Sequence, residues 1–336
     1  MGGKYEYTPD GGDLKAQLAW RKKCLNALTK EEYQYASHKS AWTHYYMALR
    51  TAALYYITLH TIIKFQSNFL VWMPLTFWQG AWITNFVWLM HDGTHQLIWN
   101  NRDTELKISL ERLSYRIYGA VCGVSSCFFK EYHGQHHHRF FRGTDDPKAT
   151  WFVPKTQRNW LLKMKYFGPG LMSIFKTLTE NVSTVSEKTR DLQAQDKKFN
   201  QLLHLCMTVY TMYNFGFMFW MKVYFIPHFV FFPVWFMVSR CGQHYCCDPN
   251  HAPFQSTPHL GGFWADLPNF YGNYHVEHHT FAEVPAYNLK YLNSILAPRL
   301  YKKENMPMFK LRHLVWGWLV ENRPHYEMWM DVAHDW

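Results

Sequence analysis

Three short clusters of histidine are the residues of this chain whose types and spacing most clearly suit a chemical function. They read His91-Asp-Gly-Thr-His95, His133-Gly-Gln-His136-His137 and His275-Val-Glu-His278-His279. Within each cluster histidines recur at a spacing of three or four residues, and side chains at that spacing share one face of a helix. Neutral imidazole is the commonest metal ligand among side chains. Each cluster therefore predicts ligands that converge on a metal ion.

The number of histidines in the clusters predicts two metal ions. A structural zinc ion takes four ligands and a catalytic one takes three plus water, so the clusters exceed the need of a single ion. Imidazole suits zinc, copper, iron and nickel alike. The sequence lacks both the Glu-x-x-His pattern of soluble di-iron bundles and the His-Glu-x-x-His pattern of zinc proteases. The pattern therefore favours a histidine-rich site for two metals.

Acidic residues beside the clusters are candidates to orient the ligands. A carboxylate that accepts the second ring N–H of a ligand histidine fixes its tautomer and its orientation. The acids considered for this role are Asp92, Asp145, Asp146, Asp266 and Glu277. The alternative for each is an ordinary place at the solvated surface or at a helix cap. Among them we favour Asp146 and Asp266.

Four apolar stretches predict helices that span a membrane and position the clusters. They form two hairpins, one from 42–63 and 69–90, the other from 202–221 and 223–239 with Lys222 at its turn. A span needs about 20 residues of helix. A fifth apolar stretch, 115–129, is too short to cross and predicts an interfacial or re-entrant helix.

The distribution of charge predicts which side of the membrane the clusters face. Lysine and arginine are frequent in both terminal regions and in the central region, and sparse in the turns of the hairpins. By the positive-inside rule, both termini and the segments 91–200 and 240–336 face the cytoplasm. All three clusters then lie on the cytoplasmic side, close to the membrane surface.

The composition fits one integrated membrane domain that covers residues 1–336. The chain is 48% hydrophobic and 19% aromatic, and no low-complexity linker divides it. The mean hydropathy of -0.33 hides this, because Trp and Tyr score as polar although they favour bilayer interfaces. The formal net charge of +10 suits anionic lipid, and no nucleic-acid-binding motif accompanies it. The seven cysteines lack paired C-x-x-C spacing and predict reduced, structural thiols.

The clusters and their flanks resemble a known family. HDGTH, HGQHH and HVEHH are similar to the three histidine boxes of the membrane fatty acid desaturase-like superfamily. Gly-Thr-Asp-Asp-Pro at 143–147 resembles a segment of acyl desaturases and carotenoid ketolases, and 272–289 resembles the family's extended third box. The resemblance covers roughly residues 42–295. Ala282 departs from it where proline is usual, and we expect this to affect the local backbone and not metal binding.

The resemblance implies an all-α integral membrane protein with four transmembrane helices and a cytoplasmic helical cap that holds a di-iron site. It also adds His244 to the eight histidines of the boxes as a ninth metal ligand. The implied cofactors are two iron ions, with O2 as co-substrate, and the implied reaction is desaturation of a fatty acyl chain. The chain has no haem, iron–sulfur or dinucleotide motif, so its electrons come from a separate ferredoxin or cytochrome.

Two alternatives stay open from the sequence. The first alternative is a hydroxylase or ketolase that uses the same di-iron centre to oxidise a carotenoid or another hydrophobic substrate. A non-enzymatic metal-binding membrane protein is the other alternative, although clusters outside the apolar stretches are unlike the ligands of transporters. Basic residues around the second box predict a docking surface for an acidic electron carrier, an acyl carrier protein or lipid phosphate: Lys130, Arg139, Arg142 and Lys148.

Overall fold

The computed structural model describes residues 14–131, 133, 186–244, 256, 259, 261–304, 306, 308–310 and 312. Over these residues every regular secondary-structure element is a helix, which confirms the all-helical prediction. The only β pairing among them is an isolated bridge between His259 and Phe309. The chain divides into two compact units. Unit 1 comprises Met1–Lys39, Tyr132–Met164 and Val238–Trp336, and unit 2 comprises Ser40–Glu131 and Lys165–Met237.

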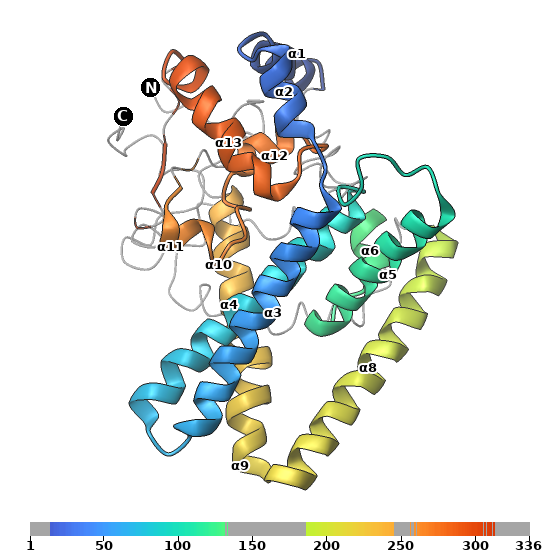
Figure 1. The fold of residues 1–336 in the computed structure, drawn as a ribbon, viewed down its shortest axis with the longest axis vertical. Coiled ribbons are helices and arrows are strands. Elements are labelled where there is room, and N and C mark those ends of the chain that lie inside the picture. Colours follow the sequence, from blue (N-terminus) through green and yellow to red (C-terminus); the bar gives the residue numbers. More distant parts are fainter. Residues whose placement is uncertain are drawn as a thin grey trace, which may run out of the picture. The chain divides into compact units, whose positions relative to one another are not determined.

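Unit 2 begins with two long helices that match the first predicted hairpin. Helix α3 (Ala41–Lys64) starts where the Ser40 hydroxyl accepts a hydrogen bond from the Thr43 amide. Helix α4 (Phe69–Thr94) starts where the Asn68 side chain accepts one from the Leu70 amide. The two helices pack side by side (Figure 1). A polar cap before each apolar run therefore fixes both starts.

The second hairpin turns at a different residue from the one predicted. Helix α8 (Glu187–Phe215) ends at Gly216, whose φ of 83° lies in the left-handed region that glycine adopts without steric cost. Lys222 lies beyond this turn, inside the next helical run, so the prediction that it marks the turn is wrong. Its ammonium group donates to the Gln66 carbonyl at 2.7 Å and lies 5.2 Å from the Trp72 ring centroid. The lysine therefore binds the loop of the first hairpin.

The helical run after Gly216 changes its pitch. It consists of α9 (Phe217–Trp220), the π-helical segment η3 (Met221–Phe231) and α10 (Phe232–His244). Pro227 lies inside the π-helical segment, and the Phe232 amide donates to the Pro227 carbonyl five residues earlier. Because proline cannot donate a backbone hydrogen bond, the ladder is rearranged around it.

By length and composition, one helical stretch among the described residues, Phe217–Phe236, is able to cross a membrane. Only 28% of its apolar window is buried inside the protein. The arrangement with four spans stays a prediction. The expected helix at 115–129 is instead two helices, α5 (Glu105–Cys122) and α6 (Ser126–Glu131), because Gly123 takes a left-handed φ of 70° and ends the first.

Helix α4 and segment η3 approach each other closely at Gly80. A Cβ atom added there would lie 2.6 Å from the Phe231 carbonyl carbon and 2.7 Å from the Phe232 amide nitrogen. Real Cβ atoms do not approach backbone so closely, so any side chain at this position forces the two elements apart.

We expect Gly80→Ala to destabilise unit 2 by about 1–3 kcal/mol, as overpacking of a close contact does. The sign is informative, because alanine in a helix interior is ordinarily more stable than glycine by about 1 kcal/mol. Thermal unfolding of the purified protein in detergent measures the change. Gly262→Ala is the control, since its Cβ would meet nothing within 4 Å. Equal unfolding temperatures for both variants would contradict the close-packing argument.

Unit 1 places its helices around the third histidine cluster. Helices α1 (Leu14–Asn26) and α2 (Lys30–Ser37) precede α3 in sequence. The cluster itself forms the short helix α12 (His275–Thr280), between α11 (Phe263–Asp266) and α13 (Ala286–Leu296), and a π-helical turn, η5 (Ala297–Tyr301), follows. Helix α1 packs on α12, and α2 packs on α13 (Figure 1).

Candidate metal centre

The first histidine cluster lies at the C-terminal end of α4 in unit 2. His91 is in the last turn of the helix and His95 is the residue that caps it. Their ring centroids are 4.5 Å apart, and a ring nitrogen of one lies within 4.8 Å of a ring nitrogen of the other. The Thr94 hydroxyl donates to the His91 carbonyl at 2.8 Å, which satisfies one terminal carbonyl of the helix. The predicted pairing of these two imidazoles on one helix face is present.

Asp92 lies beside the first ligand candidate. The Nδ1 atom of His91 is 3.3 Å from Oδ1 of Asp92, and both side chains are almost fully buried, at 2% and 1% exposure. A proton held on Nδ1 by this carboxylate leaves Nε2 of His91 as the metal-binding atom. Asp92 was among the candidate acids but was not one of the two favoured.

Unit 1 gathers four imidazoles into one cluster. His275, His278 and His279 lie on α12, and His133 comes from the second predicted box. The ring centroid of His278 lies 6.0 Å from that of His133 and 5.2 Å from that of His275. His275 and His279 are 4.7 Å apart. His275 is fully buried and His278 is 2% exposed, so water has little access to their rings.

Glu277 lies on the same short helix but does not face the histidine rings. Its Oε1 atom accepts hydrogen bonds from the Asn293 amide at 2.8 Å and the Tyr301 hydroxyl at 2.7 Å. Burial raises the pKa of the Glu277 carboxyl, and these hydrogen bonds oppose the shift. The residue therefore holds α12 to α13 and η5, and this fixes which face of α12 carries the histidines.

Asp266 anchors the loop that leads into the third cluster. It accepts hydrogen bonds from the Lys290 ammonium at 2.8 Å, the Asn273 amide at 3.0 Å and the Tyr274 hydroxyl at 3.3 Å. The Gly262 amide adds a fourth at 3.3 Å. None of these partners is a histidine. Because Asn273 and Tyr274 directly precede His275, Asp266 sets the course of the backbone into the cluster.

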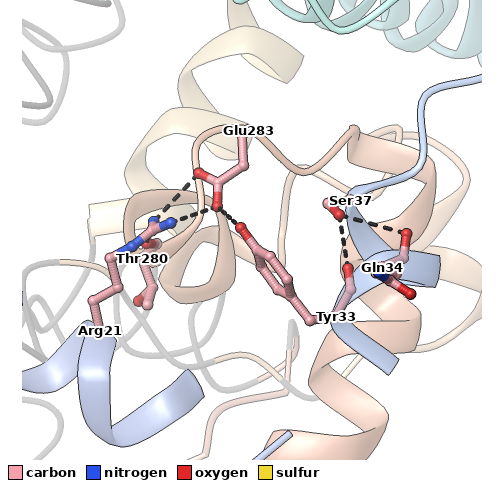
Figure 2. A network of polar contacts seen from close by, with 6 residues as sticks. All are labelled: Arg21, Tyr33, Gln34, Ser37, Thr280 and Glu283. Atoms are coloured by element: carbon pink, nitrogen blue, oxygen red, sulfur yellow. Dashed lines mark hydrogen bonds and ion pairs between the residues drawn. The ribbon is translucent and has the colours of Figure 1, made fainter. Parts of the chain in front are cut away.

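A further polar network lies at the C-terminal end of α12, and no motif predicts it. Glu283 accepts hydrogen bonds from Arg21 of α1 and Tyr33 of α2 (Figure 2). Glu283 belongs to the segment that resembles the extended third box, and its place four residues after His279 is the only local signal. Arg21 and Tyr33 are more than 200 residues away in sequence and carry no such signal.

Several predicted site residues lie outside the described part of the chain. These are His136, His137, Asp145 and Asp146. His244 is the last residue of α10, and its side chain is likewise outside the described part. The roles of all five stay predictions, as does the complete ligand set.

Buried imidazoles at these spacings are the donor set of a metal site, because neutral nitrogen ligands bind iron, zinc, copper and nickel. The profile of the family described as Fatty acid desaturase matches residues 67–312, which is well over half of the chain and includes all three clusters. The chain belongs to the fatty acid desaturase family. The resemblance seen in the histidine boxes is thereby confirmed. No curated protein matches the chain.

Membership gives this desaturase-family protein its general chemistry. It is an oxidoreductase of the desaturase or oxygenase type, with a lipid or acyl substrate, and its histidine clusters support metal binding. The family is typically associated with membranes, which agrees with the apolar stretch Phe217–Phe236.

Proposed function

We propose that the protein is a membrane di-iron oxygenase that desaturates a fatty acyl chain with O2. Electrons come from a separate redox protein, a ferredoxin or a cytochrome, and the acyl chain is free or linked to a carrier protein. The observation that carries the proposal is the family match over a segment that contains all three histidine clusters. The burial of His91, His275 and His278 supports it, because oxidation of a C–H bond requires a site from which water is excluded.

Nine histidines hold the two iron ions in this proposal: His91, His95, His133, His136, His137, His244, His275, His278 and His279. The donors that the structure describes fit iron by type, since all are imidazoles, and by spacing within each unit. Bound iron supplies the redox chemistry that activates dioxygen.

The residues of the chain supply orientation and exclusion of water. Asp92 holds a proton on Nδ1 of His91 and so presents Nε2. Glu277 holds α12 through Asn293 and Tyr301, and Asp266 holds the loop before it. Asp146 is proposed as a further carboxylate partner of a ligand histidine. A rigid support of this kind keeps imidazoles in the orientation that a metal requires.

The membrane arrangement is also a proposal. Two helical hairpins cross the bilayer, with both termini and the histidine clusters on the cytoplasmic side. Large apolar side chains are exposed along α8, and lipid would cover them: Phe199, Leu202, Leu205, Val209, Tyr210 and Tyr213.

Products formed under labelled dioxygen test the reaction. We expect cells that express the protein to accumulate a lipid or acyl product with a new double bond and without oxygen label. An alcohol or ketone that carries the label would instead identify a hydroxylase or ketolase. Mass spectrometry of extracted lipids and acyl products separates the two results. Cells that express a variant lacking a box histidine provide the background, and identical product profiles would contradict an enzymatic function.

A further inference from the structure

The end of α12 that carries His278 and His279 is tied to the N-terminal helices. Arg21 of α1 and Tyr33 of α2 both point at Glu283, which lies in the turn after α12 (Figure 2). The Arg21 guanidinium donates to both carboxylate oxygens of Glu283, at 2.6 and 3.3 Å. The Tyr33 hydroxyl donates to one of them at 2.6 Å. Two separate helices thus meet on one carboxylate.

Arg21 also contacts the backbone of α12 directly. Its Nη1 atom donates to the carbonyl of Thr280, the last residue of the helix, at 2.6 Å. Carbonyls in the last turn of a helix have no partner within the helix and carry a partial negative charge. A guanidinium at this place satisfies one of them. The planar guanidinium donates hydrogen bonds to the carbonyl and to the Glu283 carboxylate at the same time. A lysine ammonium lacks the planar, fork-shaped set of donors that this geometry requires.

The ion pair lies in a partly apolar setting. The Cζ atom of Arg21 is 4.9 Å from the centroid of the fully buried Phe281 ring, and Tyr33 packs against the same ring at 5.9 Å. Burial raises the pKa of Glu283. The hydrogen bonds from Arg21 and Tyr33 and the charge of Arg21 together lower it by more, so the net pKa is below its ordinary value. The carboxylate is therefore ionised at neutral pH and keeps both partners.

Helix α1 makes a second contact with the last residue of α12. The Trp20 indole donates to the Thr280 hydroxyl at 3.2 Å. The same indole stacks on Tyr301, with ring centroids 6.0 Å apart, and Tyr301 donates to Glu277. Helix α1 thus contacts the end of α12 directly and its middle through one intermediary.

We propose that Arg21 and Tyr33 are positioning residues for the metal, which act through Glu283 and the Thr280 carbonyl to hold His278 and His279 in their ligating orientation. Helix α12 has six residues, far fewer than an isolated helix needs to be stable in water. Its orientation must therefore come from its neighbours. Helices α1 and α2 form a clamp that retains the metal. This inference rests on the proposed function, since it takes iron as the bound metal.

Iron release tests the clamp. Purified full-length protein in detergent, loaded with iron, is mixed with an excess of a coloured iron chelator well below its unfolding temperature. We expect Arg21→Ala to release iron at least about 10-fold faster than the unaltered protein, the usual scale for loss of a residue that orients a metal ligand. Arg21→Lys keeps the charge without the planar fork and should fall between. Tyr33→Phe removes a single hydroxyl and should give a smaller increase than Arg21→Ala.

Arg299→Ala is the matched control. Arg299 also makes a two-pronged ion pair with the N-terminal helices, to Glu32 at 2.7 Å through each of two nitrogens, but it contacts no residue of α12. We expect its release rate to change less than about two-fold, because exposed ion pairs contribute little. The absorption spectrum of cobalt-loaded protein should change in Arg21→Ala and not in Arg299→Ala, which separates ligand orientation from general stability.

The outcomes distinguish the clamp from the function on which it rests. Iron release from Arg21→Ala and Arg21→Lys at the rate of the unaltered protein overturns the clamp and leaves the proposed function in place. An unaltered protein that holds no iron overturns both. If Arg21→Ala does not fold, Arg21→Lys and Tyr33→Phe carry the same test.

Discussion

Replacement of His278 by alanine is expected to abolish product formation and lower the iron content of the protein, without loss of membrane insertion. The His278 ring is buried and lies next to those of His133 and His275. Its removal leaves the metal with one imidazole fewer at a site that water does not fill easily. Loss of a residue that only supports a ligand already reduces affinity or activity by about 10–100-fold, so loss of a ligand should exceed about 100-fold.

The measurements are product formation in cells, iron per chain by elemental analysis, and recovery of the protein in the membrane fraction. His38→Ala is the control, because the His38 side chain is exposed and the contact it makes with Asn288 uses its main-chain carbonyl. That variant should match the unaltered protein in all three. Full iron content and activity in His278→Ala would remove His278 from the ligand set.

Asp266→Ala is expected to destabilise unit 1 strongly, by about 3 kcal/mol or more. The change removes one buried acceptor and leaves the donors of Asn273 and Tyr274 unsatisfied, at about 1–3 kcal/mol for each buried group. The Lys290 contact adds less, because that side chain is 55% exposed. The loop into α12 then loses its anchor, so iron content should fall together with stability.

Thermal unfolding and elemental analysis of Asp266→Ala check both parts of this prediction. Asp103→Ala is a suitable comparison, since Asp103 is 59% exposed, lies just before α5 and forms an ion pair with Lys107 of that helix. Its unfolding free energy should change by no more than about 0.5 kcal/mol. An Asp266→Ala protein as stable as Asp103→Ala would show that the loop does not depend on this carboxylate.

Helices α3 and α4 could be predicted from the sequence almost to their ends. Each apolar run is preceded by a polar residue that caps the helix, Ser40 or Asn68, so composition and local hydrogen bonding agree. The turn of the second hairpin lies at Gly216 and not at Lys222, because a charged residue between two apolar stretches need not mark a turn. The backbone freedom of Gly216 decided the turn instead. A lysine inside a helical run bends towards a polar partner and marks no boundary.

The candidate site was predictable where its geometry is local. His91 and His95 lie together because helical spacing alone places them on one face. The partners of Glu277 and Asp266 were not predictable, because they include Asn293, Tyr301 and Lys290, which only the packing of unit 1 brings to these acids. The contacts of Arg21 and Tyr33 with Glu283 depend entirely on tertiary packing, and no helical periodicity or sequence motif predicts them.

The contact between the N-terminal helices and Glu283 also sets an order of assembly during synthesis. Arg21 and Glu283 are 262 residues apart, so Arg21 leaves the ribosome long before its partner is made. At roughly 5–20 residues per second, this interval is on the order of 15–50 s. During that time α1 and α2 have no third cluster to bind. The third cluster is therefore the last part of the centre to be built, and stable metal loading is an event of the finished chain.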